Sequence, residues 1–380
     1  MKQLKGSIPL GRLFGIPIGV DYSWFLIFAL MSWSLATSYY PSRFGEWGLP
    51  VYWAAAASTT VLLFVGVLLH ELGHALVARL FHVPVRRIRL LLFGGVAELG
   101  EESPSAGSEF AIAVAGPIVS AITAAGWAAI WITLRFTGQL EPIMAVSGYL
   151  ALLNVMLALF NLIPGFPLDG GRVLRAVLWG ATGSLRQATN IAGMIGRVIG
   201  FGFLGVGVFQ ALTGNVSNGL WTAFIGMFLQ RAAAAELQSQ KLRDLLSGRT
   251  VAQVMSDSFV TLPSMITIQQ IVNSLVLQRG IRTFAVTDDD EVRGLLTVSD
   301  IEKVPGPERM QVTAGEAMQP LDRIRHVSPD TELWTALQRM EIDGLPQLPV
   351  VQDGRLLGLL RREDVFGFLY SLRRLGPQAI

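Results

Sequence analysis

Two histidines and a glutamate stand close together in His70-Glu71-Leu72-Gly73-His74, which has the pattern H-E-x-x-H. Residues i and i+4 share one face of an α-helix, so both imidazoles can reach a single metal ion. Glu71 lies beside them and can take the proton of a water on that metal. The pattern is typical of zinc proteases, and it predicts His70 and His74 as zinc ligands and Glu71 as the general base. The other histidines, His82 and His326, stand alone and are interpreted as surface or core residues.

A third ligand is expected, because a catalytic zinc typically has about three protein ligands and an open fourth position. The chain has no cysteine, so this ligand must be a histidine, an aspartate or a glutamate. The best candidate is Asp169, which follows the helix-breaking run Pro164-Gly-Phe-Pro167 and precedes two glycines. The proline- and glycine-rich backbone before Asp169 is compatible with membrane depth, because irregular backbone is tolerated there where it is buried in protein or lines a water-filled cavity. The alternatives are a loop-capping role for Asp169 and the weaker ligand candidates Glu98, Glu101 and Glu102.

The composition indicates that these residues belong to a membrane protein. Only 15% of the 380 residues are charged and 51% are hydrophobic, whereas soluble domains carry about 25% charged residues. Few charges lie between Tyr22 and Ala235, and the rest of the chain has the composition of a soluble protein. The net charge of +2 gives no reason to expect a nucleic-acid partner. We therefore expect a membrane domain over residues 1–235, a linker over 236–247 and a soluble part after it.

Six segments are apolar and long enough to cross a lipid bilayer, which requires about 20 residues. They lie at roughly 22–40, 52–80, 108–135, 142–163, 189–212 and 217–235. The glycine-rich apolar segment before the first span is expected to form short strands near the membrane interface. Basic residues gather at the connections on one side, for example Arg12, Arg79, Arg172 and Arg231. The positive-inside rule then predicts a multi-pass protein of the cell membrane with both termini cytoplasmic.

The soluble part contains an internal repeat. Thr250-Val-Ala-Gln-Val-Met255 resembles Thr313-Ala-Gly-Glu-Ala-Met318, and each is followed by a helical stretch, two β-rich runs and a short helix. Asp300 and Asp364 stand at matching points of the two copies. Two α/β units in tandem, over residues 248–306 and 307–380, favour one pseudo-symmetric module.

The first part of the chain, roughly residues 1–235, resembles the site-2 protease family of intramembrane metalloproteases. The resemblance rests on HELGH at 70–74, the FGG run at 93–95, AGP at 115–117 and NLIPGFPLDGGR at 161–172. It implies that His70, His74 and Asp169 bind Zn²⁺ and that Glu71 is the base. Asn161 matches the family asparagine that contacts the substrate or stabilises the oxyanion; a helix–helix hydrogen bond is the simpler alternative. Residues 93–97 would form a membrane-embedded strand or loop, and an extended substrate could pair with it by strand addition.

The repeat resembles a pair of CBS domains. Gly294-Leu-Leu-Thr-Val-Ser-Asp300 matches the family's ribose-binding pattern, a hydroxyl followed three residues later by an acid. The resemblance implies that Thr297 and Asp300 bind an adenine nucleotide (ATP, ADP or AMP) and that the pair forms a homodimer. The second copy departs from the pattern by placing Arg361 at the hydroxyl position. Asp300 and Asp364 could instead cap the helices that follow them.

Together these patterns predict a polytopic α-helical membrane domain with short membrane-associated strands, followed by an α/β tandem CBS domain. The predicted function is an intramembrane zinc metalloendopeptidase that cleaves transmembrane segments of membrane proteins, in regulated intramembrane proteolysis, under nucleotide control. The alternative is a transporter or channel with CBS domains, which would need ionisable residues spread along a path through several helices. A catalytically dead scaffold is disfavoured because Glu71 is intact.

Overall fold

The computed structural model describes residues 7–91, 94–100, 102–138, 140–276, 281–289 and 291–375. The chain divides into two compact units, Met1–Gln240 and Lys241–Ile380. The stretch 236–247, expected as a linker, is helical up to Leu246. The two units are joined by this continuous helix, which carries residues of both.

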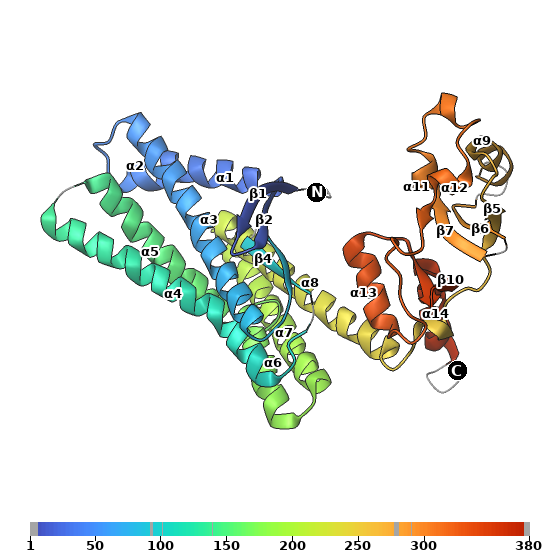
Figure 1. The fold of residues 1–380 in the computed structure, drawn as a ribbon. Helices are drawn as coiled ribbons and strands as arrows, with labels where there is room; N and C mark the ends of the chain where they lie inside the picture. Colours follow the sequence, from blue (N-terminus) through green and yellow to red (C-terminus); the bar gives the residue numbers. More distant parts are fainter. Residues whose placement is uncertain are drawn as a thin grey trace. The chain divides into compact units, whose positions relative to one another are not determined.

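The first unit consists of long helices and one small sheet (Figure 1). Its N-terminal elements are β1 (Ser7–Leu13), β2 (Ile16–Asp21), α1 (Ser23–Ser34), a π-helical turn (Leu35–Tyr39) and α2 (Tyr40–Arg43). Helix α3 (Leu49–Leu80) is followed by β3 (Val85–Leu91) and β4 (Gly94–Leu99). The remaining helices are α4 (Ala106–Thr137), α5 (Glu141–Asn161), α6 (Asp169–Thr182), α7 (Leu185–Leu212) and α8 (Val216–Leu246).

Local sequence signals set where these helices begin and end. Helices α3 and α5 each carry a proline in their first turn, where the missing N–H costs nothing. Helix α4 starts with a capping box between Ser105 and Ser108, which satisfies backbone N–H groups at its first turn. It ends at Gly138, whose left-handed backbone suits a residue without a Cβ.

Four helices in the described part of the chain, α3, α4, α5 and α7, are long and apolar enough to cross a membrane. Many of their large apolar side chains are exposed, such as Ile122 and Phe209, as expected where lipid is the solvent. Helix α1 has only 12 residues before the π-helical turn, fewer than a straight span needs. Helix α8 has a polar second half, with Gln238, Gln240 and Lys241. The expected total of six spans therefore stays a prediction.

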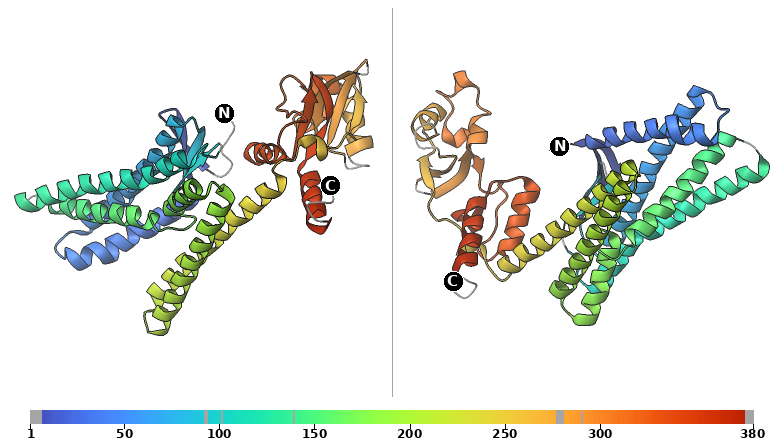
Figure 2. Two further views of the ribbon diagram at one scale, coloured as in Figure 1. Left: turned by 90° about the horizontal axis from the view of Figure 1, so that it is seen from below. Right: turned by 180° about the vertical axis from the view of Figure 1, so that it is seen from behind.

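Helix α4 packs against three other helices of this unit, α3, α5 and α6. Helix α6 packs in turn against α7. Glycines let α7 and α8 approach closely: a Cβ on Gly207 would lie 2.3 Å from the Ala223 nitrogen. Figure 2 shows α7 and α8 as an antiparallel hairpin in both views.

The short strands form one sheet in the order β1-β2-β3-β4. Strands β1 and β2 lie in the glycine-rich N-terminal segment, where the sequence predicts short strands. Strands β2 and β3 are parallel, and the other neighbours are antiparallel. The sheet packs on α3 through a buried cluster of Ile16, Leu72, Ala75 and Ile88. Leu72 lies within the H-E-x-x-H segment and Ala75 directly follows it, so the sheet covers α3 at the level of His70 and His74. Strand β4 is one of the two edge strands of this sheet.

The second unit contains two similar halves. The first half has η2 (Val251–Gln253), β5 (Val260–Pro263), α9 (Ile268–Ile271), a π-helical turn (Val272–Val276), β6 (Thr283–Asp288), β7 (Glu291–Thr297), α11 (Val298–Ile301) and η4 (Gly306–Glu308). The second half has α12 (Ala314–Ala317), β8 (Gln319–Pro320), α13 (Leu333–Asp343), β9 (Gln347–Gln352), β10 (Arg355–Arg361) and α14 (Arg362–Leu375). Leu246, at the end of α8, is buried in the core of the second half.

The two halves exchange short segments, which explains the repeated Met255 and Met318. The residue after Met318 pairs with β7 beside Gly294, and Ser256, after Met255, bridges to Leu359 in β10. At both crossings a glycine permits the approach: a Cβ on Gly294 would lie 2.5 Å from the Gln319 carbonyl oxygen, and one on Gly358 would lie 2.6 Å from that of Ser256. The internal repeat read from the sequence is therefore a pseudo-symmetric pair.

Candidate metal centre

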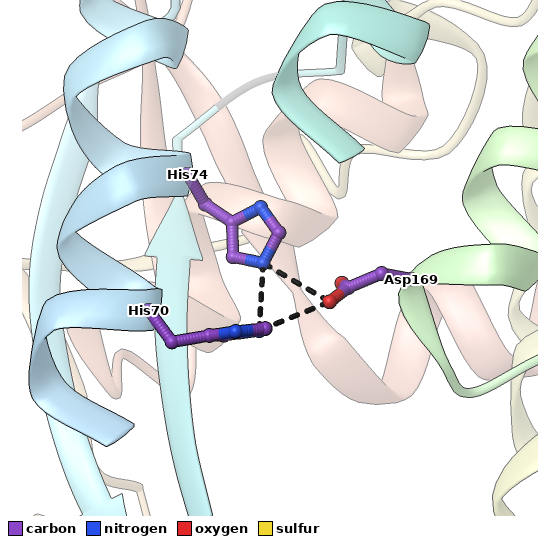
Figure 3. A group of neighbouring side chains, drawn as sticks. All are labelled: His70, His74 and Asp169. Atoms are coloured by element: carbon purple, nitrogen blue, oxygen red, sulfur yellow. Dashed lines mark hydrogen bonds and ion pairs between the residues drawn. The ribbon is translucent and has the colours of Figure 1, made fainter. Parts of the chain in front are cut away.

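His70, His74 and Asp169 converge on one point, as Figure 3 shows. Both histidines lie on one face of α3, and Asp169 is the first residue of α6. The Nε2 atoms of His70 and His74 lie 3.2 Å apart. Asp169 Oδ2 lies 3.0 Å from His70 Nε2 and 3.2 Å from His74 Nε2. Three donor atoms from two distant segments thus form a nearly equilateral triangle.

This donor set fits a zinc ion. Ligand bonds of about 2.0–2.2 Å in a tetrahedron place neighbouring ligand atoms about 3.3 Å apart, close to the distances in the triangle. Two imidazoles and a carboxylate are also a donor set that zinc accepts. Both histidines are 3% exposed, so water does not compete freely for their ring nitrogens. Within the described residues, this is the group of His, Asp and Glu side chains that could hold a metal ion.

The outer nitrogens of both imidazoles are held by α4. His74 Nδ1 donates to the backbone carbonyl of Ile112 at 2.7 Å, which leaves the Nε2 lone pair for a metal. His70 Nδ1 lies 2.9 Å from the Ser120 hydroxyl. Between these two contacts, a Cβ on Gly116 would lie 2.2 Å from His74 Nε2 and 2.7 Å from His70 Nε2. The glycine of the AGP motif is therefore required for α4 to approach the imidazoles.

The loop before Asp169 is approached closely by glycines of α6 and α7, at positions that leave no room for a side chain. A Cβ on Gly171 would lie 2.4 Å from the Gly165 carbonyl carbon, and one on Gly170 would lie 2.4 Å from the Ile163 carbonyl oxygen. Helix α7 approaches the same loop closely at Gly196, where a Cβ would lie 2.1 Å from the Phe166 carbonyl oxygen. These close approaches explain the glycines around Asp169 and set the direction of its side chain.

The side chain of Glu71 extends from α3 toward β4. Its Oε2 accepts a hydrogen bond from the backbone N–H of Ala97 at 3.0 Å. A Cβ on Gly95 would lie 2.4 Å from Glu71 Cγ, so this part of β4 needs a glycine. Because the Ala97 N–H donates to Glu71, it is directed away from the ladder with β3. The edge of β4 thus faces the glutamate next to the histidine pair.

The other ligand candidates from the sequence lie elsewhere. Glu98 pairs with two arginines, at 2.7 Å from Arg87 Nε and 3.0 Å from Arg89 Nε. Glu102 is exposed and does not join the cluster, and Glu101 and Phe93 lie outside the described residues. His326 is exposed, and His82 follows the end of α3. Asn161 is the partly buried last residue of α5, at the start of the loop that leads to Asp169.

Sequence reasoning missed three supporting residues: Ile112, Ser120 and Glu109. The Ile112 contact uses a backbone carbonyl, which has no side-chain signature. Ser120 is one of several serines and threonines in apolar helices, so its type gives no signal. Glu109 was visible as a lone carboxylate at the start of an apolar span, where ionisable residues are functional candidates.

In the second unit, Thr297 and Asp300 contact each other. The Thr297 hydroxyl donates to Asp300 Oδ2 at 2.6 Å and accepts from the Asp300 N–H at 3.3 Å, as a capping box for α11. Lys303 and the Gln319 amide both donate to Asp300 Oδ1 at 2.7 Å. Burial raises the pKa of Asp300, but these hydrogen bonds outweigh it and lower the pKa below its ordinary value.

The second copy lacks the matching hydroxyl. Asp364 Oδ2 accepts a hydrogen bond from the backbone N–H of Arg361 at 3.3 Å. This contact does not involve the Arg361 side chain, which stands where the first copy has the Thr297 hydroxyl. Both aspartates therefore take part in capping, but as the third residue of their helices and not as the N-cap residue, which is Thr297 in the first copy. Hydroxyl and carboxylate oxygens can accept further hydrogen bonds, so a capping box is compatible with a ribose bound to the same atoms.

Comparisons with known proteins point in the same direction as this geometry. The family model described as peptidase family M50 matches residues 58–142 and 136–203, and the CBS domain model matches residues 251–305 and 314–371. The Rip3 protein of Mycobacterium tuberculosis is 34% identical over 99% of this chain and 96% of its own length. The zinc metalloprotease MJ0392 of Methanocaldococcus jannaschii is 29% identical over 94% of this chain and 95% of its own.

Among solved structures, the site-2 protease from Methanocaldococcus jannaschii is 33% identical, with a TM-score of 0.42. The match covers 61% of this chain and 95% of that protease.

Proposed function

We propose that this chain, a zinc metalloprotease that belongs to peptidase family M50, the site-2 protease family, cleaves transmembrane segments of membrane proteins. The convergence of His70, His74 and Asp169 beside Glu71 carries the proposal. These residues lie in or next to helices that are apolar enough to cross a bilayer. A peptidase built there fits the role of regulated intramembrane proteolysis.

In this proposal His70, His74 and Asp169 hold the zinc ion. Bound zinc supplies Lewis acidity, which lowers the pKa of a water ligand and polarises the scissile carbonyl. The contacts of His70 with Ser120 and of His74 with Ile112 keep both Nε2 atoms directed at the site. Asp169 contributes the carboxylate from the first turn of α6, and its negative charge suits the N-terminal end of that helix.

Glu71 is proposed as the general base and then the general acid. Its carboxylate takes a proton from the attacking water, whose oxygen forms a bond to the scissile carbonyl carbon. The C–N bond then breaks, and Glu71 gives the same proton to the departing amine nitrogen. The hydrogen bond from Ala97 holds Oε2 in place for both transfers.

The edge of β4 is the proposed substrate dock. An extended peptide can add to an edge strand through main-chain hydrogen bonds, and this edge faces Glu71. A transmembrane helix must unwind locally to bind in this way, which exposes its amide to hydrolysis. Asn161 is proposed to contact the substrate or the developing oxyanion through its amide. Its place at the end of α5, eight residues before Asp169, supports that role.

The second unit is proposed to bind an adenine nucleotide through Thr297 and Asp300 and to regulate the membrane domain. Its occurrence as a CBS pair supports this role, as does the continuity of α8 into its core. A CBS pair also offers a surface for homodimer formation. The charge bias of the loops supports a cytoplasmic location for both termini.

The test uses the purified full-length chain in lipid nanodiscs with a synthetic transmembrane substrate. We expect one zinc ion per chain by metal analysis. Glu71→Gln should keep this zinc but lower the cleavage rate by about 10²–10⁴-fold, because the amide retains the shape and cannot accept the proton. Full cleavage by this variant would contradict the assignment of Glu71. Zinc-free protein that still cleaves would contradict the metal site.

A further inference from the structure

Helix α4 supplies none of the three proposed ligands, yet one stripe of it contacts every part of the metal centre. Ile112, Gly116 and Ser120 lie one turn apart and meet the two imidazoles. Glu109 lies one turn before Ile112, on the same face. It is 2% exposed and reaches toward α6, the helix that begins with Asp169. A single face of α4 therefore contacts both segments that contribute metal-binding side chains.

The contact between Glu109 and α6 is a group of charges whose central pair, Glu109 and Arg175, is buried, while Arg172 and Glu236 are partly exposed. Glu109 Oε1 accepts from Arg175 and lies 3.3 Å from Arg172 Nε. The Arg175 guanidinium also lies over the ring of Phe166, 5.2 Å from its centroid, in the loop before Asp169. Glu236 of α8 lies 3.7 Å from Arg175, so two acids offset two arginines. The group therefore contacts the chain before Asp169, at Phe166, and after it, at Arg172 and Arg175.

Stability alone is a poor explanation for such a group. Removing charges from water costs free energy that the ion pair often does not recover, and apolar residues of similar volume can stabilise as well. The best-attested use of a buried polar contact is to fix one register between two elements. Asp169 Oδ2 must lie within about 0.5 Å of a required position for metal binding, and α6 carries it. A fixed register between α4 and α6 meets that need.

We propose that Glu109 and Arg175 are positioning residues of the metal centre. They hold α6 in register on α4, so that Asp169 meets His70 and His74, whose imidazoles the same face of α4 orients. This inference rests on the proposed ligand set. It assigns a task to a buried carboxylate that lies outside the proposed ligand set.

The test changes the geometry of the pair without changing its charge. Glu109→Asp withdraws the carboxylate by one methylene, and Arg175→Lys removes the planar fork that reaches both Glu109 and Glu236. We expect each variant to weaken zinc binding about 10–100-fold, the usual effect of losing a residue that orients a ligand. We also expect a changed visible spectrum after cobalt replaces zinc, because that spectrum reports coordination geometry. Zinc affinity is measured on the full-length chain by competition with a chelator.

Glu98→Asp is the matched control, because Glu98 also pairs with two arginines but lies on β4. It should leave zinc affinity unchanged. Excess zinc should restore cleavage to Glu109→Asp and Arg175→Lys, which separates weak binding from misfolding. Asp169→Ala separates the two proposals: if it binds zinc as tightly as the wild type, the ligand set is wrong. If Asp169→Ala loses zinc while Glu109→Asp and Arg175→Lys match the wild type in affinity and spectrum, the positioning role is wrong.

Discussion

The metal centre and the Thr297–Asp300 pair both place an aspartate among polar partners, but the partners differ in origin. Asp169 meets His70 and His74, which stand 99 and 95 positions away in the sequence. Asp300 meets Thr297 and Lys303, each three positions away. The first arrangement exists because three helices pack together, whereas the second forms mainly within one turn of a helix and its cap, with one further donor, the Gln319 amide, from 19 positions away.

This difference affects what each site can be expected to do. In the metal centre, the outer nitrogens contact α4 and the three inner atoms lie within 3.2 Å of one another, an arrangement that a shared cation stabilises. At Asp300, hydrogen-bond donors already satisfy both carboxylate oxygens. A local motif such as Thr297–Asp300 can therefore match a binding pattern while it stabilises a helix end. Polar side chains that meet from distant parts of the sequence, as His70, His74 and Asp169 do, are the stronger indication of a bound ligand.

The largest expected effect comes from removing a ligand. His70→Ala, His74→Ala and Asp169→Ala should each weaken zinc binding by more than the roughly 10–100-fold cost of losing a residue that only orients a ligand. His326→Ala is the control, since this histidine is exposed and remote in sequence. Chelator competition on the full-length chain measures the affinities. Wild-type affinity in Asp169→Ala would mean that the third ligand is another group.

A smaller effect is expected when the support of the ligands is disturbed. Gly116→Ala places a Cβ 2.2 Å from His74 Nε2, so an imidazole or α4 must shift, and zinc affinity should fall by at least about 10-fold. Gly126→Ala on the same helix meets no atom within 4 Å and should keep zinc affinity. It should also stabilise the helix by up to about 1 kcal/mol. Equal zinc binding by the two variants would show that the approach of α4 is not required.

The smallest effects are expected in the second unit, where two capping boxes allow a matched comparison. Thr297→Ala and Thr313→Ala each remove a cap and should each cost about 1 kcal/mol in unfolding free energy. Only Thr297→Ala should also weaken binding of ATP, ADP or AMP to the full-length chain in calorimetric titration. Equal nucleotide binding by both variants, or none by the wild type, would leave Thr297 and Asp300 as a helix cap.

Asp300 should also make the stability of the second unit depend on pH. Its pKa is lowered in the folded chain, so its contribution is present above the ordinary aspartate pKa of about 3.9. This contribution is lost as pH falls through the lowered value. Thermal unfolding should therefore show a difference between the wild type and Asp300→Asn at neutral pH that shrinks in acid. A difference that does not change with pH would contradict the charged role of Asp300.

The sequence alone determined the features that depend on local spacing. The i, i+4 histidines predict a shared helix face, and they do share one on α3. The repeated Thr250–Met255 and Thr313–Met318 segments predict a pseudo-symmetric pair, and the structure has interlocked halves. These predictions succeed because helical periodicity and internal similarity are properties of short stretches of chain.

Tertiary structure alone decided which distant groups meet. Nothing in the sequence distinguishes Ser120 from the other hydroxyl residues of α4, or links Glu109 to Arg175 across 66 positions. Gly95 and Gly116 could be read as motif glycines, but only the packing shows that one accommodates Glu71 and the other the imidazoles. The physical reason is that these contacts depend on the rotation and register of packed helices, which result from the sum of all their contacts.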